Sequence, residues 1–377
     1  MLIYIVLYTI LLLATFYERD DVKLSDKKVV LYWLVFIFTL FRGLRWETGT
    51  DWYQYLRVFE SADWDNIFSF SRNVATHMEW GYMLINVVVK TFGGNYTVFL
   101  LATNFFVLYA YMRFALTNSV TPIFVFVLIM FSTQFFPVRI GIAVAILMLG
   151  LSDFTSRKYI RVLFFTFLAS SIHSSAVAFI PVYFGIVVKK FPTLLAVLIA
   201  IIWMQLALIP SYNTFLFSIA GNLNVLGEET AHKFENYLDY GLTKSTIVVV
   251  AGNVSTTLFI ILLWLFGRMI DKKRPTLEDS KINYDFLYNV YFVFMMIAIA
   301  FPGERMTGLR RLQNYFMFAF PVLFSVFILN GKRRFPAYKF VFTMALIVYA
   351  LFRMYTLFFG RDPEIHFPYR SIFTDAF

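Results

Sequence analysis

Long apolar segments recur along almost the whole chain, and this feature most limits how the chain can fold. About twenty apolar residues are the length that an α-helix needs to cross a bilayer. The composition agrees, because 60% of the 377 residues are hydrophobic and only 15% are charged, whereas soluble domains carry about 25% charged residues. We therefore predict an all-α, polytopic integral membrane protein that forms one domain over residues 1–377.

The apolar segments predict about twelve transmembrane helices, some of them broken or re-entrant. Residues 79–92 are too short to cross comfortably and are candidates for a re-entrant segment, and the break around Pro137 leaves the helix count between 79 and 152 open. Residues 2–17 lack the basic start and the cleavage site of a signal peptide, so we expect a retained helix. The predicted helices are 2–17, 28–43, 96–116, 121–136, 138–152, 160–172, 174–188, 192–209, 246–267, 285–302, 312–330 and 339–359.

Lysine and arginine gather in four loops that fall on one side of the membrane with this set of helices, and such loops are cytoplasmic. The larger loops 44–78 and 210–245 lie on the other side and contain more acids than bases. The net charge of +10 therefore reflects membrane orientation, and we expect no nucleic-acid partner. The basic loops are 157–161, 189–190, 268–284 and 331–339.

The stretch LFRGLRWETGTDWYQYLRVF, residues 40–59, combines charges and aromatic rings beside a membrane-length segment. The rings are typical of the aromatic belt at a membrane surface. They also suit a sugar, whose C–H faces stack on rings while its hydroxyls bind the neighbouring Glu47 and Asp51. The sequence favours neither interpretation. The rings in question are Trp46, Trp52, Tyr53 and Tyr55.

Two arginines precede this acidic and aromatic stretch. Gly49 permits a tight turn, after which Thr50 or Asp51 could cap a helix that starts near Trp52. Capping does not explain Arg42 and Arg45. Arg42 could simply extend toward the membrane surface, but two guanidiniums also form a suitable site for a phosphate.

Other outward-facing polar residues are candidates for the same site. Arg139 opens an apolar helix, where it is either an anchor at the membrane surface or part of a pocket, and we favour the pocket. The loop FPGERMTGLRRLQNY departs from the charge rule by placing several arginines outside, and an anionic ligand explains them. These arginines are Arg305, Arg310 and Arg311.

If the outward-facing site needs a general base, the candidates are Asp51, Glu79 and His173. Arginines near Asp51 would keep it ionised, which suits binding a hydroxyl but not taking up a proton, so we assign Asp51 to positioning a hydroxyl of the ligand. His173 lies among serines in the turn of a short helical hairpin, and its usual pKa of about 6.5 suits proton transfer near neutral pH. Desolvation could raise the pKa of Glu79 into the same range. We rank His173 ahead of Glu79, while a purely structural role for His173 stays open.

The absence of several motifs excludes other functions. The chain has no cysteine, which excludes disulfides and thiol nucleophiles. It also has no Walker A, HExxH or GxSxG motif, so we expect no cofactor and no metal.

Five motifs together resemble the EpsG-like proteins. They are RGLRWETGTDWYQY, the run Glu79-Trp80-Gly81-Tyr82, RIGIAVAI beginning at Arg139, IHSSA around His173, and the terminal PYRSIF. One departure is Ile140, where the family often has glutamine. The resemblance covers nearly the whole chain.

The resemblance implies a Wzy-type polymerase of bacterial exopolysaccharide, capsule or O antigen, with an architecture like the GT-C membrane glycosyltransferases. It implies a multi-pass protein of the bacterial inner membrane whose site faces the periplasm or the cell exterior. The implied substrate is a polyprenyl-diphosphate-linked oligosaccharide, with membrane lipid, a chain-length regulator and a flippase as further partners. The alternatives are another membrane glycosyltransferase or ligase with a polyprenyl-linked donor, or a transporter of lipid-linked sugars.

Overall fold

The computed structural model describes residues 2–49, 51–67, 78–133, 135–136, 138–151, 159–180, 189–207, 209, 246–272, 283–300, 311–332, 344, 346–352, 354–355 and 368–373. These residues are mainly helical, and their only strand-like pairing is one β-bridge between Arg45 and Ser371. The all-α prediction is therefore confirmed for the described part of the chain.

The chain divides into two compact units. The first unit comprises Met1–Tyr183 and Phe324–Phe377, and the second comprises Phe184–Leu323. The first unit contains α1 (Leu2–Ala14), η1 (Thr15–Tyr17), α2 (Leu24–Gly43), α3 (Trp52–Ser61), α4 (Trp64–Ile67), α5 (Trp80–Thr91), α6 (Tyr96–Asn118), α7 (Pro122–Ser132), α8 (Arg139–Leu151), α9 (Tyr159–Ile172) and η2 (Ser174–Phe179). The second contains α11 (Thr193–Ala207), α14 (Thr246–Asp271), α16 (Tyr284–Ala300) and η4 (Arg311–Tyr315), and α18 (Ala319–Lys332) runs from the second unit into the first.

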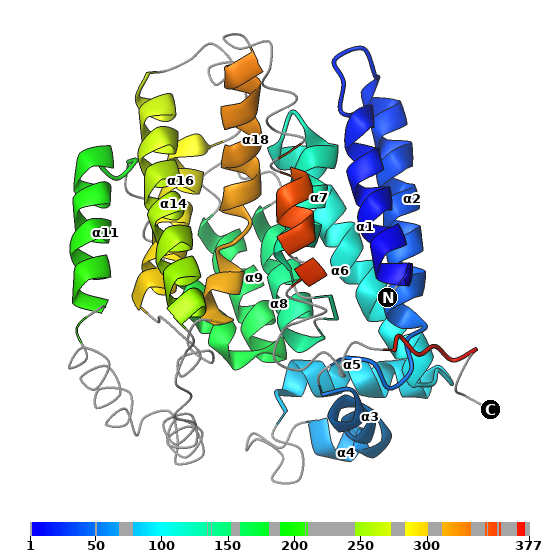
Figure 1. Ribbon diagram of the computed structural model, residues 1–377. Helices are drawn as coiled ribbons and strands as arrows, with labels where there is room; N and C mark the ends of the chain where they lie inside the picture. Colours follow the sequence, from blue (N-terminus) through cyan, green and yellow to red (C-terminus); the bar gives the residue numbers. More distant parts are fainter. Residues whose placement is uncertain are drawn as a thin grey trace. The chain divides into compact units, whose positions relative to one another are not determined.

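In the first unit, α6 packs against α2 and α8, and α8 also packs against α9. Two glycines permit these close contacts. A Cβ atom on Gly43 would lie 2.8 Å from the Leu101 Cα atom, and one on Gly150 would lie 2.6 Å from the Phe165 Cβ atom. The short helices α3, α4 and α5 are grouped beside one another (Figure 1).

A buried carboxylate connects the α1–α2 turn to α7. The Glu18 side chain, which is 1% exposed, accepts a hydrogen bond from the Lys27 Nζ atom at 2.6 Å. It also accepts one from the Ile123 backbone N–H at 2.7 Å. A carboxylate at a helix N-terminus satisfies an otherwise unpaired N–H and interacts favourably with the helix dipole. Glu18 therefore fixes this end of the first unit.

In the second unit, α11, α14 and α16 pack against one another. The Lys190 Nζ atom lies 2.8 Å from Asp271 Oδ1, and the Thr193 hydroxyl donates to Asp271 Oδ2 at 2.8 Å. The Phe191 N–H donates to Asn289 Oδ1 at 2.8 Å. These polar contacts tie the start of α11 to α14 and α16.

Most of the described helix bounds agree closely with the apolar segments, but the predicted helix 312–330 is divided into η4 and α18. The predicted helix 174–188 begins as the 3-10 helix η2, and its residues 181–188, much of 339–359 and the whole loop 210–245 lie outside the described residues.

The break around Pro137 separates two helices, because α7 ends at Ser132 and α8 begins at Arg139. Among the described residues, one helix, Tyr96–Asn118, is long and apolar enough to cross a membrane, and other apolar helices are 10–17 residues long. The predicted number of membrane crossings and the single integral domain stay predictions.

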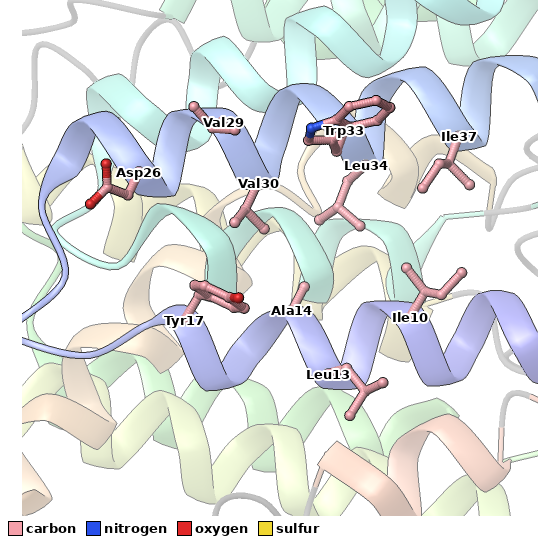
Figure 2. A pocket seen from close by; sticks show the side chains of 10 residues that line it. All are labelled: Ile10, Leu13, Ala14, Tyr17, Asp26, Val29, Val30, Trp33, Leu34 and Ile37. Atoms are coloured by element: carbon pink, nitrogen blue, oxygen red, sulfur yellow. The ribbon is translucent and has the colours of Figure 1, made fainter.

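A groove of about 500 Å³ lies between α1 and α2 (Figure 2). Apart from Tyr17 and Asp26, its lining is apolar, and it contains no arginine or lysine. It therefore offers no cation to a phosphate, and the polar chemistry must be sought elsewhere. The lining residues are Ile10, Leu13, Ala14, Tyr17, Asp26, Val29, Val30, Trp33, Leu34 and Ile37.

Candidate active site

An ion pair between Glu79 and Arg139 forms the centre of the polar cluster in the first unit. The Arg139 Nη1 atom lies 2.6 Å from Glu79 Oε2, and the two side chains are 20% and 11% exposed. The other carboxylate oxygen of Glu79 accepts a hydrogen bond from the Ser174 backbone N–H at 2.9 Å. Both oxygens of Glu79 are thus engaged by donors from other segments of the chain.

Local sequence explains how these groups meet. Glu79 immediately precedes α5, and Arg139 is the first residue of α8. Gly81 lies in the first turn of α5, where a Cβ atom would come within 2.8 Å of the Ser171 backbone oxygen at the end of α9. Only glycine permits this approach without displacement. Gly81 thereby brings Glu79 to the residues that follow α9.

His173 lies between α9 and η2 and directly precedes Ser174, whose backbone N–H binds Glu79. Its Nδ1 atom is within hydrogen-bonding distance of the Ser175 hydroxyl, at 2.8 Å. The imidazole also interacts electrostatically with Glu79. The predicted candidates Glu79, Arg139 and His173 therefore lie together.

The charge on Arg139 determines the protonation of Glu79. Burial alone would raise the pKa of the Glu79 carboxyl, but Arg139 and the Ser174 N–H outweigh burial and lower it below its usual value. The expectation that desolvation raises the pKa of Glu79 is therefore wrong, because the sequence does not reveal which cation faces the carboxylate. Glu79 is an anion near neutral pH and a weak proton acceptor.

Tyrosines connect this cluster to the opening motif. The Tyr55 hydroxyl accepts a long hydrogen bond from Arg139 Nε at 3.4 Å, and the Arg139 guanidinium lies 5.7 Å from the centre of the Tyr55 ring. The Tyr55 and Tyr82 rings meet edge to face with their centroids 5.8 Å apart. Arg45 interacts electrostatically with the hydroxyls of both tyrosines.

The opening motif is held against the C-terminal segment, residues 369–372. The Trp46 N–H donates to the Arg370 carbonyl at 2.9 Å, and the Ile372 N–H donates to the Leu44 carbonyl at 3.0 Å. The Tyr369 hydroxyl donates to the Phe41 carbonyl at 2.6 Å. The terminal PYRSIF motif therefore lies against the opening motif.

The predicted rings of the opening motif differ in exposure. Trp52 is buried, and it meets Trp46 edge to face with centroids 5.0 Å apart. Tyr53 is 56% exposed. Asp51 is the N-cap residue of α3, as expected, but it has a left-handed backbone with φ 63° and no side-chain capping bond. Its side chain is exposed.

The predicted role of the loop arginines, Arg305, Arg310 and Arg311, stays a prediction. Arg305 and Arg310 lie outside the described residues. Arg311 is exposed at the start of η4 and belongs to the second unit. No three His, Asp or Glu side chains are grouped like metal ligands in the part of the chain that the structure describes.

Sequence reasoning missed two buried tyrosines. Tyr82 is 0% exposed and Tyr96 is 6% exposed, and Arg45 interacts electrostatically with both. Tyr82 stands in the quoted Glu79-Trp80-Gly81-Tyr82 run, so its motif was available as a signal. Tyr96 opens an apolar helix and gave no comparable signal.

Comparisons with known proteins give one match. Neither the curated proteins nor the solved structures contain a match to this chain. A family model, the EpsG family, matches residues 28–371, which include the opening motif, Glu79, Arg139 and His173. The resemblance noted in the sequence is confirmed, and the chain belongs to the EpsG family of Wzy-like polysaccharide polymerases.

Proposed function

We propose that this chain polymerises polyprenyl-diphosphate-linked oligosaccharide repeat units on the outer face of a bacterial inner membrane. The product is an exopolysaccharide, capsule or O antigen. The observation that carries this proposal is the cluster of Glu79, Arg139 and His173, which three separate family motifs contribute to one place.

The reaction exchanges one bond at the anomeric carbon of the donor glycan. The bond from this carbon to the diphosphate oxygen breaks, and its electron pair leaves with the diphosphate. A sugar hydroxyl of a second repeat unit forms the new bond, and its proton goes to a general base. Arginines stabilise the departing negative charge, and one positioned base is sufficient.

His173 is the proposed base. Glu79 is a poorer choice, because Arg139 and the Ser174 N–H stabilise its ionised form. A carboxylate beside an imidazole stabilises the imidazolium that forms when the proton is taken up. Glu79 therefore supports His173, and Arg139 holds Glu79 in place.

Aromatic side chains near this cluster are proposed to position the sugars. Trp46 is half-buried and Tyr53 is exposed, so both rings are accessible to a glycan. Asp51 is exposed beside them and can accept hydrogen bonds from sugar hydroxyls.

The test uses the full chain purified in lipid nanodiscs and supplied with polyprenyl-diphosphate-linked repeat units. A ladder of longer glycans on a gel is expected, whereas unchanged units would contradict the proposal and favour transport or binding. His173→Gln keeps hydrogen bonding but cannot take the proton, so the rate should fall by roughly 10²-fold or more. Val177→Ala, an exposed position on η2, is the matched control and should polymerise normally.

A further inference from the structure

Two arginines at the end of α2 are buried, and neither pairs with a charged side chain among the residues that the structure describes. Arg42 lies in the last turn of α2 and Arg45 follows the helix, and each is 1% exposed. The Nε and Nη1 atoms of both guanidiniums have no hydrogen-bond partner in the described part of the chain. A buried cation normally has a counterion or several acceptors, because desolvation is costly.

The contacts that these arginines do make are weak. Arg42 Nη2 lies 3.8 Å from the Met130 sulfur, which is a poor acceptor. The Arg45 guanidinium lies 4.7 Å from the centre of the Phe136 ring. A cation–π contact offsets only part of the cost of burying a charge.

Nearby acids are engaged elsewhere. Among the described residues, Glu79 binds Arg139 and Glu47 binds Arg370. Arg42 and Arg45 also repel each other electrostatically. Among the described residues, only neutral tyrosine hydroxyls thus offset the positive charge of these two arginines.

Neutral donors surround the same place. The Trp52 Nε1 atom is buried and lacks a hydrogen-bond partner among the described residues, and the buried Tyr82 and Tyr96 hydroxyls have only loose contacts, with Asn86 and Arg45 respectively. Arg45 interacts electrostatically with both hydroxyls, and the Trp52 and Tyr96 rings lie 5.5 Å apart. Two guanidiniums, two hydroxyls and an indole therefore form a set that is rich in donors and contains no carboxylate, and such a set complements a polyanion.

We propose that Arg42 and Arg45 form the diphosphate-binding site, with Tyr82, Tyr96 and Trp52 as neutral donors. The identity of the anion as the donor's diphosphate rests on the proposed function. Arg139 is then not a diphosphate ligand but a positioning residue, because Glu79 already balances its charge. The bidentate geometry of two guanidiniums matches two phosphate groups. Because both arginines are closed off from solvent, binding requires a local opening.

The test measures anion binding, not polymer formation. Wild-type protein in nanodiscs is titrated with inorganic pyrophosphate, and the affinity and the unfolding temperature are recorded. Pyrophosphate should bind and raise the unfolding temperature. The inference would be overturned if millimolar pyrophosphate neither binds to the wild-type protein nor raises its unfolding temperature.

Variants then locate the site. Arg42→Met and Arg45→Met should each weaken pyrophosphate binding at least about tenfold. Without ligand, each should unfold at the same or a higher temperature, because an uncompensated buried charge has been removed. A variant that binds normally, or that unfolds or misfolds without ligand, would overturn the inference by showing that the arginine is a structural anchor.

Three comparisons sharpen the assignment. Arg139→Gln should keep the wild-type pyrophosphate affinity, and so should the control Arg113→Gln, at an exposed position of α6. Weaker pyrophosphate binding by Arg139→Gln would contradict the assignment of Arg139 as a positioning residue. Arg45→Lys keeps the positive charge but loses the paired N–H donors of the guanidinium. Its pyrophosphate affinity should therefore lie between those of wild type and Arg45→Met. Normal affinity in Arg45→Lys would contradict bidentate binding.

A competition experiment with lipids tests whether the bound anion belongs to a lipid or is free in solution. It also distinguishes failure of this inference from failure of the proposed function. Polyprenyl diphosphate in the nanodisc should compete with pyrophosphate, whereas polyprenyl monophosphate should compete more weakly. If polyprenyl diphosphate does not compete, the site takes a free anion and the link to the donor lipid is wrong. Pyrophosphate binding through Arg42 and Arg45 without polymer formation would refute only the proposed function. Polymer formation with unchanged pyrophosphate binding in both methionine variants would refute only this inference.

Discussion

Arg370 binds Glu47 although 323 residues separate them in the chain, with 2.8 Å between the Arg370 Nη1 atom and Glu47 Oε2. Glu47 has a left-handed backbone with φ 44°, an uncommon conformation for a side chain of this type. The C-terminal segment, residues 369–372, thus contacts the opening motif at a strained turn. This contact makes the end of the chain part of the candidate site.

We expect the C-terminal segment to depend more on Tyr369 than on the ion pair. Arg370 and Glu47 are 45% and 27% exposed, and ion pairs of that kind contribute about 0–1 kcal/mol. The Tyr369 hydroxyl donates to the Phe41 carbonyl at 2.6 Å, and its ring stacks on Phe41 with centroids 4.6 Å apart. Tyr369→Ala should therefore speed amide hydrogen exchange at residues 44–48 much more than Arg370→Gln does. Equal effects of the two variants would contradict this ranking.

The Glu79–Arg139 pair should show strong coupling in a double-mutant cycle. Glu79→Gln leaves a half-buried guanidinium without its counterion, and Arg139→Gln leaves a carboxylate with only the Ser174 N–H. Each single change should lower the free energy of unfolding by about 1–3 kcal/mol, and the double variant should lose less than the sum. Additive losses, measured by chemical unfolding, would mean that the two side chains do not stabilise each other.

Gly81 should be intolerant of even one added carbon. Gly81→Ala places a Cβ atom 2.8 Å from the Ser171 backbone oxygen, and such overpacking costs about 1–3 kcal/mol. It should also lower the polymerisation rate, because Glu79 moves away from Ser174. Gly93→Ala is the control: φ is 76° and no atom lies within 4 Å of the added carbon, so it tests backbone strain alone. Similar polymerisation rates in the two variants would show that the α5–α9 distance is unimportant.

Most of the described helix bounds were predictable, because long apolar runs favour helices and polar residues interrupt these runs where the helices end. The prediction 160–172 became α9, Tyr159–Ile172, and 96–116 became α6, Tyr96–Asn118. Alternating sides in the helix order also placed Glu79, Arg139 and His173 on one face. Such local rules do not depend on tertiary packing.

The pairing within the site was not predictable from the sequence alone. The low pKa of Glu79 depends on Arg139, and their meeting depends on the contact between Gly81 and Ser171. Asp51 was expected among arginines and aromatic rings. In the structure it has a left-handed backbone and an exposed side chain. The contact between residues 369–372 and 44–48 joins segments that are more than 300 residues apart in the chain, and periodic sequence patterns do not predict such a long-range pairing.

The proposed orientation is testable with single cysteines, because the chain has none of its own. Gln54 on α3 and Lys23 at the start of α2 are both exposed and lie on either side of α2 along the chain. In intact cells, an impermeant maleimide should label Gln54→Cys but not Lys23→Cys. Labelling of Lys23→Cys before the inner membrane is opened would reverse the orientation, and the candidate site would then face the cytoplasm.

The low pKa of Glu79 sets the pH range in which the ion pair stabilises the fold. Because the folded-state pKa lies below the unfolded value of about 4.3, this stabilisation is complete above that value and is lost as the pH falls through the folded pKa. The difference in unfolding temperature between wild type and Glu79→Gln should therefore be constant from pH 8 to about pH 5 and should shrink below about pH 4. A difference that shrinks between pH 7 and pH 6 would mean that the Glu79 pKa is raised. Polymerisation should behave differently, because an imidazole that has already bound a proton cannot act as the base. The rate should therefore fall between pH 8 and pH 5 while the stability is constant, and this fall should be absent in the residual activity of His173→Gln; a flat wild-type rate from pH 8 to pH 5 would exclude His173 as the base.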